Sequence, residues 1–222
     1  MINIVSKIVR WCAAQSPWQQ RGFVFLMGVL SVLALAPFYI APILFMTVPL
    51  FLICHDRCQT KRASFWLGWW FGFGYFTFGL YWIANALLVD VASFWWVIPF
   101  AVMGLPFGRS FFWALASLAL TKITTTSVSK WLVFGVIFSM AEWLRGHILT
   151  GFPWNLLGYA FVDYPALLQG ASIIGIYGLT LYTFLLAASP YPLLADKKSK
   201  KPFLIMFVIT VVLGGWGTVS YT

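Results

Sequence analysis

The stretch WLVFGVIFSMAEWLRGHIL, residues 131–149, decides the fold class of this chain. It is long enough to cross the hydrocarbon core of a bilayer as one α-helix, which takes about 20 mostly apolar residues. Glu142 and Arg145 interrupt it near its end. Their spacing puts both side chains on one helix face, where each charge neutralises the other and lowers the cost of its neighbour near lipid. The stretch therefore predicts a transmembrane helix with an internal ion pair.

The composition of the whole chain also indicates a membrane protein. Of its 222 residues, 62% are apolar and 20% are aromatic, while 9% are charged. Soluble domains carry about 25% charged residues, so this chain has too few polar side chains to cover itself in water. Seven spans of about 20 residues use roughly 140 residues and leave roughly 80 for loops and ends. We expect no folded domain outside the membrane in that remainder.

Seven apolar runs separated by charged clusters predict an all-α, polytopic membrane protein with about seven transmembrane helices. The runs are 22–37, 40–54, 63–88, 93–120, 131–149, 166–189 and 203–219. The first two runs are short, and Pro37 and Pro42 bracket their link. They form either two spans or a hairpin that does not fully cross, which would leave six full spans. We expect a transmembrane domain over 22–219, preceded by an N-terminal segment, 1–21, that is either a surface helix or a frayed tail.

The basic residues predict the orientation of the bundle, because most of them fall in connections on one side of a seven-span topology. These residues are Lys7, Arg10, Arg21, Arg57, Lys61, Arg62, Lys122, Lys130, Lys197, Lys198, Lys200 and Lys201. By the positive-inside rule that side is cytoplasmic, which places the N-terminus inside and Thr222 outside. Topology therefore explains the net charge of +9. We expect no nucleic-acid partner, since no soluble basic stripe is left to bind one.

Residues 150–165, TGFPWNLLGYAFVDYP, form the longer of two predicted outer loops, the other being 89–92. Gly151 and Pro153 break the preceding helix, so Phe152 and Trp154 are presented on irregular backbone at the membrane surface. Such a loop suits contact with an acyl chain. A tryptophan just after a helix end is also a common interfacial anchor, so both interpretations stay open.

Other residues that could carry chemistry are sparse. Glu142 and Arg145 form either a functional site or a structural ion pair. Arg109 either pairs with an acidic group, snorkels or contacts a lipid phosphate. The run 54–58, CHDRC, lacks the second ligand pair that a zinc site needs, and we read it as an ordinary loop. We expect no metal and no cofactor. We also expect no disulfide, because the cysteines lie on the predicted cytosolic side, where thiols stay reduced.

The run AEWLRG at 141–146, followed by TGFPW at 150–154 and Gly158-Tyr159, resembles the signature of bacterial apolipoprotein N-acyltransferase. LAPF at 35–38 is similar to the opening hairpin of that family. GLYWI at 79–83 and IGIYG at 174–178 are similar to its third and sixth spans. The resemblance covers nearly the whole chain, in order.

This resemblance implies a multi-pass protein of the bacterial inner membrane. The family transfers an acyl chain from a phospholipid to the α-amino group of the lipidated N-terminal cysteine of an apolipoprotein. A periplasmic nitrilase-type domain carries its Glu, Lys and Cys, which act through a thioester. This chain departs from that pattern, because its one glutamate, Glu142, belongs to the membrane motif and no nitrilase-type domain follows the seventh span. We therefore expect no catalytic residues and no activity of the chain alone.

What the resemblance carries over is a platform for lipid at the outer leaflet. In it, Glu142 and Arg145 order the fifth span, 151–154 forms a loop, and Trp82 and Tyr159 supply aromatic lining. The predicted lipid-binding residues are Glu142, Arg145, Gly151, Phe152, Pro153, Trp154, Tyr159 and Trp82. The implied partners are a phospholipid acyl donor, a lipoprotein N-terminus and, if the enzyme is split, a separate nitrilase-type chain.

Two other functions stay open at this stage. One is a non-catalytic membrane module that binds lipid or lipoprotein. The other is a small transporter, which the sequence favours less, because it shows no internal repeat and Asn85 and Arg109 are too sparse to trace a polar path.

Overall fold

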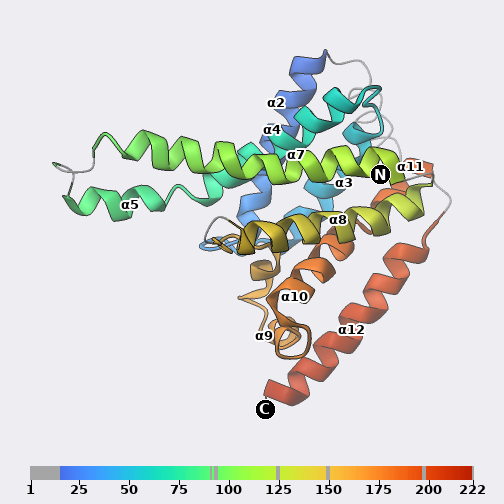
Figure 1. Cartoon of the computed structure of the whole chain (residues 1–222). Helices are drawn as coiled ribbons and strands as arrows, with labels where there is room; N and C mark the ends of the chain where they lie inside the picture. Colours follow the sequence, from blue (N-terminus) through green and yellow to red (C-terminus); the bar gives the residue numbers. More distant parts are fainter. Residues whose placement is uncertain are drawn as a thin grey trace.

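A computed structural model describes residues 16–90, 92, 95–123, 126–148, 151–196 and 199–221. Within these ranges all regular secondary structure is helical, which confirms the predicted fold class. The longer helices are α2 (Pro17–Ser31), α3 (Leu44–His55), α4 (Lys61–Gly79), α7 (Leu105–Ile123), α8 (Ser127–His147), α10 (Ala171–Ala188) and α12 (Lys201–Tyr221). Figure 1 shows them as one bundle, with α12 along one flank.

Each predicted apolar run overlaps one of these longer helices. Among the described residues, four helical stretches are long and apolar enough to cross a membrane: Phe100–Lys122, Ser127–His147, Ala171–Ala195 and Lys201–Ser220. The chain is therefore a polytopic membrane protein. Seven full spans stay a prediction, since α2 and α3 have only 15 and 12 residues. The predicted surface helix falls mostly on residues 1–15, which lie outside the described residues.

Hydroxyl side chains start three of the helices. Ser16 accepts a hydrogen bond from the backbone N–H of Gln19 and so caps α2. Thr60 caps α4, and Thr126 forms a capping box with Ser129 at the start of α8. Such caps satisfy backbone N–H groups that a helix leaves without partners. Each of these three helices therefore begins directly after the hydroxyl residue that caps it.

Two glycines let α2 and α4 approach closely. A Cβ atom added at Gly28 would collide with the backbone carbonyl oxygen of Phe71, and one added at Gly74 would collide with that of Phe25. Small residues allow such close approach in membrane proteins, where van der Waals packing drives helix association. The resulting contact places the end of α4 beside the link between α2 and α3.

A buried polar cluster closes one end of the bundle, which we call the basic end. Lys130, at the start of α8, donates hydrogen bonds to His55 Nδ1 (2.6 Å) and Asp56 Oδ1 (2.6 Å). The Tyr191 hydroxyl donates to Asp56 Oδ2 (2.9 Å), and His55 Nε2 donates to the Ser117 carbonyl oxygen (2.9 Å). Here α3, α7, α8 and α11 (Tyr191–Asp196) meet. The CHDRC run is thus part of a cluster that the sequence analysis missed.

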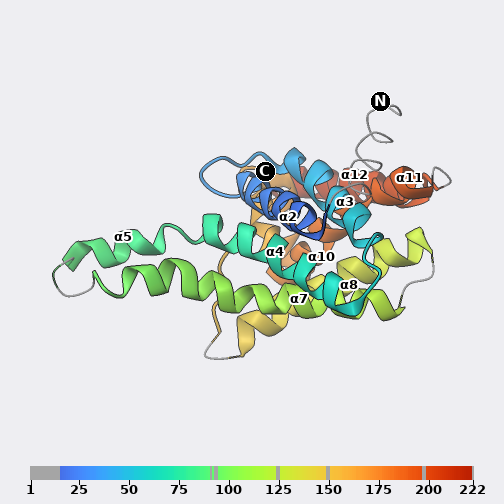
Figure 2. The same ribbon diagram turned by 90° about the horizontal axis from the view of Figure 1, so that it is seen from above.

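The third predicted span, 63–88, is wrong in its last third, because α4 ends at Gly79. The following residues form an arm, residues 80–104, whose described part includes α5 (Ile83–Leu87), a 3₁₀ turn (Leu88–Asp90) and a π-helix (Phe100–Gly104). Figures 1 and 2 show α5 and the first part of α7 extending beyond the other helices. Hydropathy did not predict that α4 ends at Gly79, because the arm is as apolar as α4 itself.

Candidate functional site

The predicted site residues gather at the end of the bundle opposite the basic end, which we call the motif end. It comprises the last turns of α4 and α8, the loop 151–156 and the 3₁₀ turn η5 (Leu157–Phe161). The link between α2 and α3, with 3₁₀ turns at Val32–Ala34 and Ala41–Ile43, lies beside it. Residues far apart in sequence therefore meet at one end of the bundle.

Glu142 and Arg145 form a buried ion pair one helical turn apart on α8. Their exposed fractions are 0% and 2%. Arg145 Nη2 contacts Glu142 Oε2, and Arg145 Nε donates to Glu142 Oε1 (3.2 Å). The indole Nε1 of Trp113, from α7, also donates to Oε1 (2.7 Å). The pair predicted from sequence is present, and both carboxylate oxygens of Glu142 are engaged.

Side chains from three helices hold the loop after α8 by its carbonyl oxygens. Arg145 Nη1 donates to the carbonyls of Phe152 (3.1 Å) and Trp154 (3.0 Å). Arg109 Nη1, from α7, donates to the same Phe152 carbonyl (2.9 Å), and the Tyr75 hydroxyl, from α4, donates to the Asn155 carbonyl (2.8 Å). Backbone carbonyls that no helix pairs are costly near lipid, so these donors fix the loop in one conformation.

Glycine and proline in the motif match the backbone of this loop. Gly151 has φ +70°, and a Cβ there would collide with the Gly146 carbonyl oxygen. A Cβ atom added at Gly146 would meet the Tyr177 hydroxyl and the side chain of Pro153. A left-handed φ favours glycine because it has no Cβ. The loop therefore turns back tightly onto the last turn of α8.

A cavity of about 1140 Å³ opens beside this loop. Trp82, Trp154 and Tyr159, which the sequence analysis predicted as aromatic lining, all line it. The ring centroids of Trp82 and Trp154 are 5.3 Å apart. The rest of the wall is Val29, Val32, Leu33, Leu35, Ala36, Pro37, Phe38, Tyr39, Phe78, Gly79, Tyr81, Asn155 and Val162. This wall is mainly apolar and aromatic, which suits an acyl chain better than a polar solute.

The other five predicted residues do not line this cavity: Glu142, Arg145, Gly151, Phe152 and Pro153. Arg145, which is paired with Glu142, donates to the carbonyl oxygen of Trp154 in the wall. The sequence analysis missed the contribution of the α2–α3 link, although LAPF at 35–38 was the signal that could have found it.

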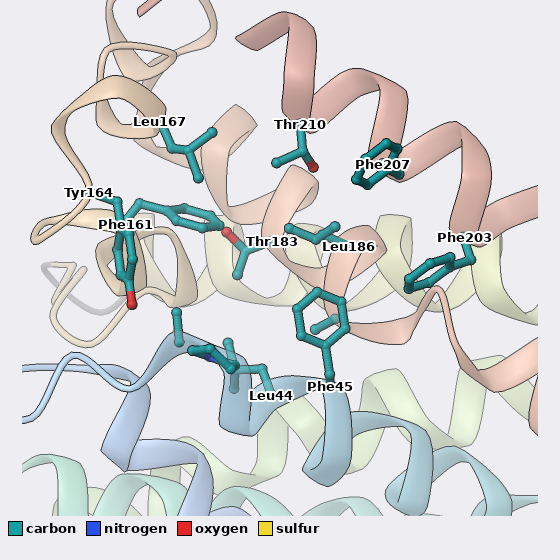
Figure 3. A pocket seen from close by; sticks show the side chains of 13 residues that line it. Leu44, Phe45, Phe161, Tyr164, Leu167, Thr183, Leu186, Phe203, Phe207 and Thr210 are labelled. Atoms are coloured by element: carbon teal, nitrogen blue, oxygen red, sulfur yellow. The ribbon is translucent and has the colours of Figure 1, made fainter. Parts of the chain in front are cut away.

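A second, smaller cavity of about 240 Å³ lies between α3, α10 and α12. Figure 3 shows Phe45 on α3 and Phe203 and Phe207 on α12 facing it, with Leu186 on α10. Its two threonine hydroxyls, Thr183 and Thr210, already donate to carbonyl oxygens of their own helices. This cavity therefore offers only apolar contact, and none of the predicted site residues lines it.

The cysteines of the described residues lie at the basic end, away from the large cavity. Cys54 is in the last turn of α3, and Cys58 follows in the link to α4. Burial raises the pKa of the Cys58 thiol to about 11. A thiol with a raised pKa carries little thiolate at neutral pH, and the thiolate is the nucleophile. Among the described residues, no group of three His, Cys, Asp or Glu side chains is placed to hold a metal ion.

Comparison with known proteins gives a consistent result. The model of the apolipoprotein N-acyltransferase N-terminal domain matches residues 27–189. The apolipoprotein N-acyltransferase of Rhodopseudomonas palustris is 42% identical over 193 residues, 85% of this chain and 36% of the relative. That of Bradyrhizobium diazoefficiens is 43% identical over 182 residues, 80% of this chain and 34% of the relative. That of Rickettsia typhi is 38% identical over 192 residues, 85% of this chain and 38% of the relative. The chain thus spans a little over a third of their length.

The ion pair makes a prediction about stability. Glu142→Gln leaves the Arg145 charge buried without a counter-ion, and we expect it to lower the free energy of unfolding by about 3 kcal/mol. The double variant Glu142→Gln/Arg145→Met removes both charges and should lose less than the sum of the two single variants. Unfolding in mixed micelles, followed by circular dichroism, measures these differences.

The matched control is His147→Gln, at the exposed last residue of α8, which should change the unfolding free energy by less than about 0.5 kcal/mol. Equal effects of Glu142→Gln and His147→Gln would contradict a buried pair that stabilises the motif end.

Proposed function

Because this chain belongs to the apolipoprotein N-acyltransferase family, whose N-terminal domain matches residues 27–189, we propose that it is the membrane part of such an acyltransferase. In this proposal the large cavity receives an acyl chain of a phospholipid, the acyl donor that the family resemblance implies. The acceptor is the lipidated N-terminal cysteine of an apolipoprotein. The protein lies in the bacterial inner membrane, with its motif end on the periplasmic side.

The observation that carries this proposal is the position of the motif loop against the cavity. Trp154 belongs to the TGFPW motif and lines the cavity wall with Trp82. It is 53% exposed, although the backbone that carries it is held by Arg145. An exposed aromatic ring on a fixed loop is a ready contact surface, because little conformational entropy is lost when a ligand binds.

The eight predicted residues then divide into two roles. Trp82, Trp154 and Tyr159 contact the lipid, since they line the cavity. Glu142, Arg145 and 151–153 are positioning residues, since they act through the loop. This division explains why the motif contains a buried ion pair that a ligand in the cavity does not reach.

We further propose that the 222-residue polypeptide does not transfer an acyl chain by itself. A thioester route needs a thiolate and a carboxylate that manages protons. The one glutamate, Glu142, is fully buried and bound to Arg145, and Cys54 and Cys58 lie at the basic end. A nitrilase-type chain that supplies these groups is the partner that this proposal requires.

A binding role alone is the second candidate function, and the same cavity favours it. A module that binds lipid or lipoprotein without catalysis needs the aromatic wall and the fixed loop but no nucleophile. The two candidates make the same prediction for lipid retention and differ in whether a partner chain restores acyl transfer.

The lipid-binding part of the proposal predicts the effect of Trp154→Ala. Losing the indole removes a large apolar contact, so we expect the purified protein to retain about tenfold less phospholipid in mild detergent. Lipid extraction and mass spectrometry of the purified chain give the molar ratio of phospholipid to protein.

Trp143→Ala is the matched control for this measurement. Trp143 lies near the same end, is 50% exposed and does not line the cavity, so its removal should leave phospholipid retention unchanged. Unchanged retention in Trp154→Ala, or an equal loss in both variants, would count against the cavity as a lipid site.

The proposed lack of activity of this polypeptide alone predicts the outcome of complementation. In a strain depleted of its own apolipoprotein N-acyltransferase, expression of this chain alone should not restore N-acylated lipoproteins, as read from the mass of an N-terminal lipopeptide. Co-expression with a nitrilase-type chain that restores them would support the acyltransferase proposal. Restoration by this chain alone would overturn the proposed lack of activity.

A further inference from the structure

Arg109 is a charged residue of the motif end that the site described above does not use for charge balance. It forms no salt bridge with a carboxylate of the described residues. Both oxygens of Glu142 are already engaged by Arg145 and Trp113. Two guanidinium groups therefore lie beside one carboxylate, which leaves one positive charge beside the motif loop.

The side chain of Arg109 is held in place, and toward the described residues it donates one hydrogen bond, from Nη1. Its Nη1 donates to the Phe152 carbonyl oxygen (2.9 Å), and its guanidinium carbon lies 4.1 Å from the centroid of the Phe152 ring. Its Nε is buried and has no hydrogen-bond partner among the described residues. A guanidinium has five N–H donors. The contact with Phe152 holds the guanidinium of Arg109 against the loop.

Arg109 also lies at the depth of lipid headgroups. Arg109 and Arg145 donate to the same Phe152 carbonyl, so they lie at the same level in the bundle. Arg145 is two residues before the end of α8, where the exposed His147 marks the limit of the apolar stretch. Headgroups lie directly beyond the hydrocarbon core, at the ends of spanning helices. We therefore expect phosphates of the bilayer at the level of Arg109, while the nearby Glu142 carboxylate is already paired with Arg145.

We propose that Arg109 binds the phosphate group of a phospholipid, and so holds the headgroup of the lipid whose acyl chain enters the large cavity. A phosphate oxyanion matches the fork of a guanidinium and accepts two parallel hydrogen bonds from it. The ring of Phe152, against which Arg109 packs, lies 6.0 Å from that of Trp154 in the cavity wall. The headgroup contact and the acyl-chain contact are thus adjacent on one loop.

This inference rests on the proposed function, since it names the headgroup site of the same lipid. The headgroup proposal can be tested separately from the proposed function, because the two concern different chemical groups of the lipid. The cavity recognises an apolar chain, which diacylglycerol and phospholipids share, whereas Arg109 recognises the phosphate, which diacylglycerol lacks.

The test compares three lipids on the purified 222-residue chain in lipid-free micelles. Native mass spectrometry measures the binding of dioleoyl phosphatidylglycerol, dioleoyl phosphatidylethanolamine and dioleoylglycerol. The variants are Arg109→Gln, Arg109→Lys, which keeps the charge, and Lys122→Gln as a control at the exposed far end of α7. Calorimetry with inorganic phosphate tests whether free phosphate occupies the same site. Arg109→Lys keeps the test informative if Arg109→Gln does not fold.

We expect Arg109→Gln to bind both phospholipids about tenfold more weakly, which is the effect of losing a charged hydrogen bond. Its affinity for dioleoylglycerol should stay unchanged, Arg109→Lys should be intermediate, and Lys122→Gln should match the unmodified chain. Phospholipid affinities of Arg109→Gln and Arg109→Lys within twofold of the unmodified chain would overturn the proposal. Arg109-dependent binding of inorganic phosphate without any preference for phospholipid over dioleoylglycerol would also overturn it.

The two failures can be told apart. If Trp154→Ala leaves lipid retention unchanged while Arg109→Gln removes the preference for phosphate, the acyl-chain cavity is wrong and the headgroup site stands. If Trp154→Ala weakens all three lipids equally while Arg109→Gln changes nothing, the cavity stands and the headgroup site is wrong.

Discussion

The motif end depends on one requirement, which is that the carbonyl oxygens of an irregular loop find donors where water is scarce. The loop 151–155 follows a helix end and has no helix or sheet to pair its carbonyls. Arg145 satisfies two of them, Arg109 shares one of these, and Tyr75 satisfies a third. Each donor comes from a different helix. Hydrogen bonds from α4, α7 and α8 therefore hold the loop, and they fix the position of Trp154 within it.

A charged donor such as Arg145 can serve this purpose only if its charge is balanced. Glu142 supplies that balance from the same helix face, and Trp113, from α7, also donates to Oε1 of the Glu142 carboxylate. Removing either charge would leave the other buried and unpaired, which is the costly case for an intramembrane ion pair. The ion pair therefore holds the loop, and the loop in turn positions the aromatic wall that we propose contacts lipid. Arg109 adds a donor without a balancing charge, and that difference distinguishes it from Arg145.

Much of this arrangement could be predicted from the sequence, and the parts that could not have physical reasons. Apolar runs located the longer helices, because hydropathy reports burial in lipid, and the i to i+3 spacing identified the Glu142–Arg145 pair. Hydropathy did not show that α4 ends at Gly79, since the arm that follows is equally apolar. It also could not show that Lys130 reaches His55 and Asp56, because that contact joins residues more than 70 positions apart. The cavity wall formed by the α2–α3 link depends on the close approach of α2 and α4, which only the packed structure reveals.

Backbone amide exchange over 151–158 in lipid nanodiscs tests the central claim most directly, when the unmodified chain is compared with Arg145→Gln. If the ion-paired arginine holds the loop, the substitution should speed exchange of these amides by about tenfold or more, because the loop then opens without global unfolding. The amides of α12, which are remote from Arg145, should keep their rates and so report that the bundle stays folded. Equal exchange of the loop in both proteins, with α12 unchanged, would contradict the claim that Arg145 fixes the loop over the cavity.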